Sequence, residues 1–302
     1  MTAARPDARP ERSDAAGTEI VFHLGVHCTD AGRIAGYLSD NAAILAEAGI
    51  AAPPPESFRP IVNEAIQELR GGIAPAAREA ALIEQLAGDA SPPRIVLSHE
   101  SLMGPASRIL EGESVYPVAG PRIHALRNLF PRHRVSFALA VRNPAHFLPA
   151  AFARQKDVTE EEFFARIAAD RLRWSEVVAA LRDHVPQAPF TVWRHEALPD
   201  LWPAAIAALL GADVDVPVQG AARFQDEVLS ESGAARLRDY VAAQPPGDAV
   251  QAARVFRAFR GWFGAPPPAP ARWDNEACAV IAAAYEADAP RIGQIRGVHF
   301  LG

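Results

Sequence analysis

The sequence predicts an α/β protein, with a small parallel sheet wrapped by helices and a helical C-terminal region. Three observations predict this fold class. Four short, mostly apolar segments lie far apart along the chain, stretches with helical periodicity separate them, and after Gly211 only helical patterns remain. Strands that alternate with helices are typical of βαβ units, whose parallel sheet is covered on both faces.

The predicted strands are residues 19–24, 94–98, 134–141 and 190–194. The first is rich in β-branched and aromatic residues and ends at Gly25. The second follows two prolines, the third runs into Arg142-Asn143-Pro144, and the fourth follows a proline-bounded turn. Apolar runs of this length between turn residues are typical of strands buried on both faces.

Helical periodicity predicts helices over residues 33–48, 59–69, 76–86, 122–129, 144–155, 160–168, 172–183 and 199–210, and then over 230–242, 249–262 and 274–288. Proline-rich stretches at 244–247 and 264–270 separate the last three, because consecutive prolines block helix and central strand alike. We expect residues 1–18 to be a disordered tail rather than a signal peptide, since they lack an apolar stretch. Residues 19–302 then form one α/β domain, whose helical part begins at about 228.

The composition bounds the function. The chain has 302 residues, is 49% hydrophobic and carries a net charge of -6, which argues against a surface for nucleic acid or anionic membrane. Its two cysteines, Cys28 and Cys278, cannot form a disulfide framework, which favours a reducing compartment. No apolar run is long enough to span a bilayer. We therefore expect a cytoplasmic protein with no membrane span and no nucleic-acid partner, and the oligomeric state stays open.

The first loop has the geometry of a phosphate site. A strand passes through a turn at Gly25 into a helix that begins near Arg33, so that unpaired N–H groups and the helix dipole point at one place. The position where such a loop usually carries Lys holds Cys28, and Asp30 follows two residues later. The alternative is an ordinary turn between a strand and a helix.

A second candidate feature is Arg142, at the end of the third predicted strand and directly before a helix that starts at Pro144. This position places a guanidinium above the sheet edge where α/β proteins bind ligands. Arg is suited to a bidentate hold on phosphate or carboxylate. The alternative is an ion pair with an acidic neighbour.

Two further groups have chemistry to offer. His99 and Glu100 leave the second strand, and either is a candidate general base toward an acceptor hydroxyl. The alternative for Glu100 is a cap or a salt bridge at the following helix. Cys28, at a helix N-terminus, is a candidate acidified thiol, and its alternative is a small apolar filler. The five tryptophans are interpreted as packing.

Together, the string His23-Leu-Gly25-Val-His27-Cys28-Thr29-Asp30-Ala31-Gly32 and the string Arg142-Asn143-Pro144 resemble the sulfotransferase family, a P-loop-like fold that uses 3'-phosphoadenosine 5'-phosphosulfate (PAPS). The family's loop has the form His-x-Gly-x-His-Lys-Thr-Gly-Thr-Thr. Similarity in residues 41–53, 96–100, 192–198 and 285–301 extends the resemblance over most of the chain from residue 19 onward.

The resemblance implies a role for each matched position. Gly25, His27, Cys28, Thr29 and Arg33 would line the 5' side of PAPS, and Arg142 would hold the 3'-phosphate. His99, Glu100 and His27 would be the catalytic residues, and the acceptor would be a small molecule or a glycan with a hydroxyl or an amine. No metal is implied.

The departures from the family pattern fall on the cofactor loop. Cys28 replaces the Lys that stabilises charge during sulfuryl transfer, and Asp30 would repel a phosphate unless it is paired, for example with Arg33. Ala31, Gly32 and Ala150 replace hydroxyl residues. Two functions therefore stay open: a PAPS-dependent sulfotransferase, or a catalytically inactive, repurposed member that binds another ligand or a protein partner. A third idea is Cys28 as a nucleophile or redox thiol.

Overall fold

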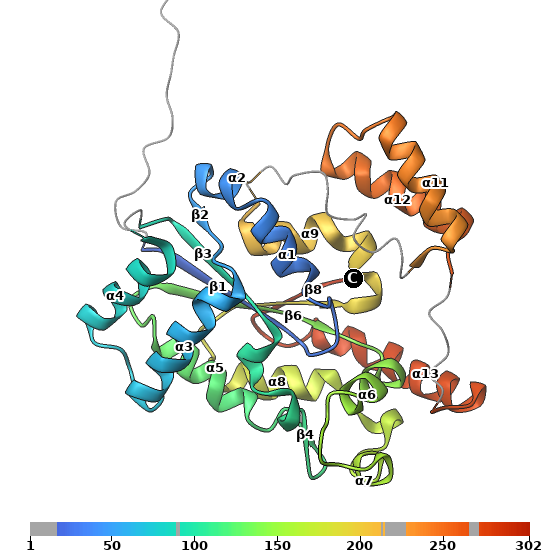
Figure 1. The fold of residues 1–302 in the computed structure, drawn as a ribbon. Helices are drawn as coiled ribbons and strands as arrows, with labels where there is room; N and C mark the ends of the chain where they lie inside the picture. Colours follow the sequence, from blue (N-terminus) through green and yellow to red (C-terminus); the bar gives the residue numbers. More distant parts are fainter. Residues whose placement is uncertain (1–16, 89–90, 213, 215–227, 266–271) are drawn as a thin grey trace, which may run out of the picture.

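The computed structural model describes residues 17–88, 91–212, 214, 228–265 and 272–302 (Figure 1). The predicted tail lies outside the described residues, apart from its last two positions. The core of the fold is a six-stranded sheet in the order β2-β3-β1-β6-β7-β8, in which every neighbouring pair of strands is parallel. The prediction of an α/β protein with a parallel sheet is thereby confirmed.

The four predicted strands form the centre of this sheet. They are β1 (Glu19–Gly25), β3 (Arg94–Ser98), β6 (Arg134–Val141) and β7 (Phe190–Arg194). Two shorter strands, β2 (Ile50–Ala51) and β8 (Val298–Leu301), form the edges and were not predicted. A separate two-stranded hairpin, β4 (Leu110–Glu111) with β5 (Ser114–Val115), was not predicted either.

The helices between the strands lie close to the predicted ranges. They are α3 (Pro55–Leu69), α4 (Ala76–Ala87), α5 (Ala119–Asn128), α6 (Pro144–Phe152), α8 (Trp174–His184) and α9 (Leu198–Leu210). The C-terminal region holds α11 (Glu231–Ala243), α12 (Ala249–Phe263) and α13 (Asn275–Ile292).

Two helix predictions need correction. The helix predicted over 33–48 is two helices, α1 (Arg33–Asp40) and α2 (Ala42–Glu47), because the chain leaves the helical conformation at Asn41, whose φ is -107°. The helix predicted over 160–168 ends early, as α7 (Glu160–Phe164), although its start is fixed by a capping box between Thr159 and Glu162.

The sheet lies between two layers of helices (Figure 1). One face is covered by α3, α4, α5, α6, α8 and α13, which bury residues such as Phe58, Ile123 and Trp174 against it. The other face is covered by α1, α9, α11 and α12, with Tyr37 and Trp202 among the buried residues. Each face therefore has its own hydrophobic core, as expected of a three-layer α/β arrangement.

This topology positions a candidate site at the carboxyl ends of the strands. The chain leaves β1 and β7 toward the face with α1 and α9, whereas it leaves β3 and β6 toward the face with α5 and α6. Neighbouring strands whose connections diverge leave a crevice above the sheet edge, where open α/β sheets bind ligands. None of the described helices is long and apolar enough to cross a membrane.

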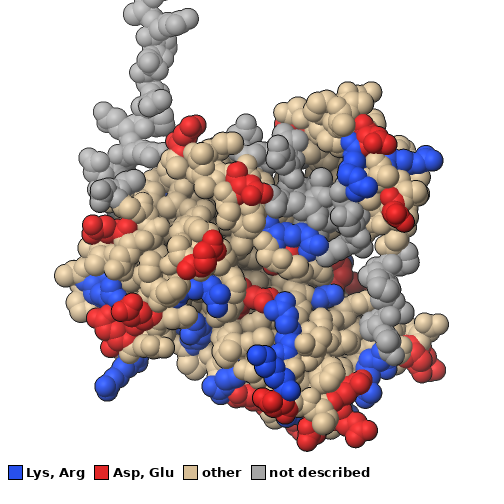
Figure 2. Space-filling model, in the orientation of Figure 1, with Lys and Arg blue, Asp and Glu red and all other residues tan. Residues whose placement is uncertain are grey.

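The charged surface is mixed. On the face shown in Figure 2, basic and acidic side chains are interspersed over the described residues, without a broad area of one sign. This face therefore has no wide positive surface of the kind that binds nucleic acid or anionic lipid.

Candidate functional site

The loop between β1 and α1 turns repeatedly through left-handed backbone conformations. Gly25 has a φ of 72°, and Cys28, Ala31 and Gly32 have φ values of 63°, 50° and 77°. Where left-handed residues alternate with right-handed ones, main-chain N–H groups can point to one side and form a concavity suited to an anion. Gly25 is required here, because a Cβ atom at this position would lie 3.2 Å from the Cβ atom of Glu100. The loop therefore packs directly against the turn that follows β3.

The main-chain N–H of Cys28 is already bonded to an anion of the protein itself. It donates to Oε2 of Glu100 over 3.2 Å, while Oε1 of Glu100 accepts from Nη1 of Arg154 over 2.6 Å. Burial alone would raise the pKa of Glu100, but the hydrogen bond from Arg154 and the nearby His27 hold this pKa below its ordinary value. The loop thus holds an ionised carboxylate where the resemblance implied a phosphosulfate.

The N-terminus of α1 is also satisfied from within the chain. Oδ2 of Asp30 accepts from the main-chain N–H of Ile34 over 2.9 Å, and Asp30 is buried, with 8% of its surface exposed. Arg33 donates to the main-chain oxygen of Asp30, at 3.1 Å. The carboxylate predicted to repel phosphate therefore acts as a cap of α1, which is the favourable place for a negative charge at a helix end.

His27 points into the core. It is only 2% exposed and stacks on Tyr116, with the ring centroids 5.7 Å apart. The phenol oxygen of Tyr116 accepts from the His27 main-chain N–H over 3.0 Å and lies 3.1 Å from Nδ1 of the ring. Burial lowers the pKa of His27 to about 4, so the ring is neutral at pH 7. His27 therefore connects the loop to Tyr116 in the core by packing and hydrogen bonding.

His99 is oriented by its own turn. Its Nδ1 accepts from the main-chain N–H of Ser101 over 3.0 Å, so the His99 side chain caps the 3-10 turn η2 (Glu100–Met103). The same nitrogen lies 2.8 Å from the Ser101 hydroxyl. In the neutral ring the proton is then on Nε2, and Nδ1, the nitrogen that could take up a further proton, is already accepting a hydrogen bond. Burial and the charge of Arg59 lower the pKa of His99. Both candidate bases, His99 and Glu100, are thus already engaged in hydrogen bonds.

Arg142 contacts the first loop directly. Nη1 of Arg142 donates to the main-chain oxygen of Cys28. The turn that carries Arg142 is held by three side chains from distant parts of the chain: Trp174 donates its indole N–H to the Arg142 oxygen, Glu196 accepts from the Asn143 N–H, and Tyr285 donates to Glu196. The guanidinium is therefore fixed against the loop by direct contact.

The charge of Arg142 acts on two neighbouring histidines. Burial and the charges of Arg142 and Arg33 lower the pKa of His195 to about 3, and burial and Arg142 lower the pKa of His146. Among the described residues, Nε of Arg142 and Nδ1 of His195 are buried without a hydrogen-bond partner. Buried polar atoms without partners are rare in folded proteins, and here they lie beside a guanidinium. This side of the site is suited to an anion.

Neither Thr29 nor Cys28 has the chemistry that the sequence suggested for it. The hydroxyl of Thr29 is buried and donates to the main-chain oxygen of Val26 over 2.7 Å. Burial raises the pKa of the Cys28 thiol, which is the opposite of the change that an acidified nucleophile requires. The described residues contain no group of three or more His, Cys, Asp or Glu side chains placed to hold a metal ion.

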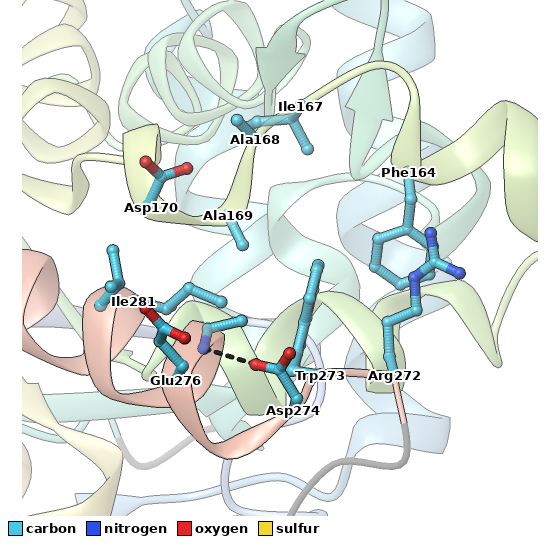
Figure 3. A pocket seen from close by; sticks show the side chains of 12 residues that line it. Phe164, Ile167, Ala168, Ala169, Asp170, Arg272, Trp273, Asp274, Glu276 and Ile281 are labelled. Atoms are coloured by element: carbon cyan, nitrogen blue, oxygen red, sulfur yellow. Dashed lines mark hydrogen bonds between the residues drawn. The ribbon is translucent and has the colours of Figure 1, made fainter.

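A pocket of about 460 Å³ lies away from this site, between α7 and the start of α13 (Figure 3). Arg272 stacks over the ring of Phe164 at 4.8 Å, and Trp273 donates its indole N–H to the oxygen of Ala145 at the start of α6. The residues that line this pocket include none of the predicted site residues. It is a feature that sequence reasoning did not find.

Sequence reasoning also missed the residues that hold the site in place through hydrogen bonds. They are Tyr116, Arg154, Trp174 and Tyr285. No local pattern could have found Tyr116 or Arg154, because each reaches the loop only through the tertiary fold.

No protein-family model matches this chain, and no curated protein matches it either.

Proposed function

We propose that this chain is a sulfotransferase-like protein that no longer transfers sulfuryl groups from PAPS and uses the same crevice to bind a different anionic ligand. The observation that carries the proposal is the hydrogen bond from the Cys28 N–H to Glu100. A carboxylate already bonded to the loop amide and paired with Arg154 competes with any phosphosulfate for that place.

The other loop residues agree with this proposal. Asp30 holds the N-terminus of α1, and no lysine stands at position 28 to neutralise charge on a transferred group. A phosphosulfate would bring further negative charge beside two carboxylates, and like charges at this range repel strongly when water is excluded. The residues present therefore do not fit PAPS in the way that the family resemblance implied.

The Arg142 side supports retained anion binding. Arg142 and His195 each present a buried nitrogen without a hydrogen-bond partner among the described residues. An anionic oxygen would satisfy the Nε–H of Arg142, because charge-assisted hydrogen bonds are the strongest of their kind. Nδ1 of the neutral His195 ring can donate to the same anion in one of its two tautomers. This half of the crevice is where we expect the ligand to be held.

The second candidate function is an active PAPS-dependent sulfotransferase with a hydroxyl or amine acceptor. The observation that favours it is the contact between Arg142 and the first loop, since such an enzyme needs these two elements side by side. In that case His99 or Glu100 would have to leave its present hydrogen bond in order to accept a proton from the acceptor.

Calorimetric titration with adenosine 3',5'-bisphosphate separates the two candidates. We expect no binding heat from the wild-type protein up to about 1 mM ligand, which bounds the binding free energy at about -4 kcal/mol. The variant Cys28→Lys, Asp30→Gly, Ala150→Ser, Glu100→Gln should bind, because it restores the cation and the hydroxyl and removes both carboxylates.

The matched control is Cys278→Lys, which adds the same charge at a half-buried cysteine of α13. It should not create binding. Tight binding by the wild-type protein would contradict the proposal and favour the active enzyme. Absence of any gain in the fourfold variant would show that the crevice does not accept this nucleotide even with the family residues in place.

A further inference from the structure

A second pocket, of about 490 Å³, lies between α3, α5 and the turns that follow β3. Figure 1 shows α3 and α5 side by side on the lower face of the sheet. Three arginines line this pocket, Arg70, Arg108 and Arg122, and the other described residues that line it are apolar or glycine. None of these lining residues carries a carboxylate. In a chain with 36 acidic and 30 basic residues, this local excess of positive charge is distinctive.

Arg122 is held in a fixed orientation by neutral partners. Its Nε donates to the main-chain oxygen of Leu102 over 3.0 Å, and its Nη2 donates to Oδ1 of Asn63 over 2.6 Å. Burial and the charge of Arg59 lower the pKa of Arg122. A guanidinium fixed by uncharged oxygens keeps its full charge available to a ligand.

Arg59 adds a further positive charge to the same place. Arg59, Asn63 and Ile66 stand four and three residues apart in α3, so they lie along one face of the helix. Arg70 follows the last residue of α3 in a left-handed conformation, with a φ of 49°. Nε of Arg59 is buried and has no hydrogen-bond partner among the described residues. Asn63 and Ile66 of this face contact Arg122 and the pocket, respectively. The face of α3 that carries Asn63 and Ile66 is therefore turned toward the pocket, and Arg59 lies near Arg122 without lining the pocket itself.

The charges of this cluster are only partly balanced. Arg108 is paired with Glu111 over 2.7 Å, which offsets its charge. For Arg59, Arg70 and Arg122, the described part of the chain supplies no ion pair with a carboxylate. Arg59 and Arg122 are half-buried and close enough for the charge of one to act on the other, and like charges in such a place repel unless an anion neutralises them. An external anion is the missing partner.

We propose that this pocket binds a compact anion with two or more negative charges, namely phosphate or sulfate groups on an aliphatic or sugar body. Planar guanidinium groups match phosphate and sulfate oxygens in a bidentate manner. No aromatic side chain lines the pocket among the described residues, which disfavours a ligand with an aromatic body. Its volume is within the range of small-molecule sites.

This inference does not depend on the proposed function, because neither Arg142 nor any residue of the first loop lines the pocket. The pocket does lie beside the end of β3, since Arg122 holds the Leu102 oxygen in the turn that follows His99. The two anion sites can therefore be tested separately in the same protein.

The test is calorimetric titration of the full chain with inorganic pyrophosphate and, separately, with fructose 1,6-bisphosphate at low ionic strength. We expect both to bind. If contacts with the sugar contribute to the affinity, fructose 1,6-bisphosphate alone binds. Arg122→Gln and Arg70→Gln should each weaken binding about tenfold, because both arginines line the pocket and each substitution removes a charge-assisted contact. Raising the salt concentration should weaken it further. Arg142→Gln should have no effect on this affinity.

The matched control is Arg134→Gln, an exposed arginine at the amino end of β6. It should leave binding unchanged, and far-ultraviolet circular dichroism should show that all variants are folded. Absence of binding by both probes would overturn the proposal. Equal losses in Arg70→Gln and Arg134→Gln would overturn it too, because they would show attraction by net charge and not by this pocket.

Discussion

At the scale of single residues, the site shows carboxylates in places where a ligand's anionic groups would be expected. Glu100 and Asp30 each accept a hydrogen bond from a main-chain N–H of the first loop or of α1. A loop of this shape favours negative charge near its amides. In this chain two of its own side chains supply that charge.

His27 makes the stability of the fold depend on pH. Its pKa is about 4 in the folded protein, against an ordinary value of 6.5, so the unfolded chain binds the proton more tightly. Stability contributed by the neutral ring is therefore fully present above about pH 6.5 and is lost as the pH falls toward 4, by up to about 1.4 kcal/mol per pH unit. Urea unfolding at several pH values between 7 and 4.5 measures this slope.

The variant His27→Phe keeps a ring stacked on Tyr116 but cannot be protonated, so its stability should fall less steeply with acidification. The exposed His299→Phe is the control and should leave the slope unchanged. An unchanged slope in His27→Phe would show that His27 does not stay neutral in the folded protein.

At the scale of helices and strands, the sequence predicted what local patterns specify. β1, β3, β6 and β7 were found because each is an apolar run bounded by turn residues. β2 has only two residues, and β8 is a half-buried edge strand that carries His299, so neither has a pattern of its own. Their strand conformation comes from pairing with β3 and β7.

For the candidate site, too, the sequence indicates only what the topology of the sheet determines. The meeting of Arg142 with the first loop follows from parallel strands whose carboxyl ends share one edge, and this rule is visible in the sequence. The partners of each atom are not visible. The hydrogen bond between Cys28 and Glu100 joins residues 72 positions apart, and it depends on the close packing of Gly25 against Glu100.

The cap of α1 gives a prediction for a single helix. Asp30→Ala removes the carboxylate that accepts from the Ile34 N–H and should lower the free energy of unfolding by about 1 kcal/mol. Asp30→Asn should cost less, because its amide oxygen can still accept this bond. The measurement is the midpoint of urea unfolding for each variant.

The exposed Asp157→Ala is the control for loss of an aspartate and should change the midpoint little. If Asp30→Ala proved as stable as the wild-type protein, Asp30 would not be acting as a cap. Its carboxylate would then only repel anions, as the sequence first indicated.

At the scale of the whole molecule, the C-terminal helix completes a site built by the first two hundred residues. α13 packs beside α8 and α6, and β8 adds the last strand to β7. From α13, Tyr285 reaches the β6–α6 turn, where its hydroxyl donates to Glu196 over 3.0 Å and lies 3.3 Å from the Val141 oxygen. Glu196 in turn holds the Asn143 N–H beside Arg142. The position of Arg142 is thus coupled to a residue 143 positions later.

This coupling can be measured with Tyr285→Phe, which keeps the buried ring and removes only the hydroxyl. One oxygen of Glu196 then loses its donor in a partly buried place, which should lower the free energy of unfolding by about 1–2 kcal/mol. Because Glu196 also orients the turn that carries Arg142, we expect the same variant to weaken any anion bound on that side, while pyrophosphate binding at the pocket between α3 and α5 stays unchanged. Tyr240→Phe, at an exposed tyrosine of α11, is the control. A stability loss in Tyr285→Phe no larger than in Tyr240→Phe would mean that α13 packs on the core without positioning Arg142.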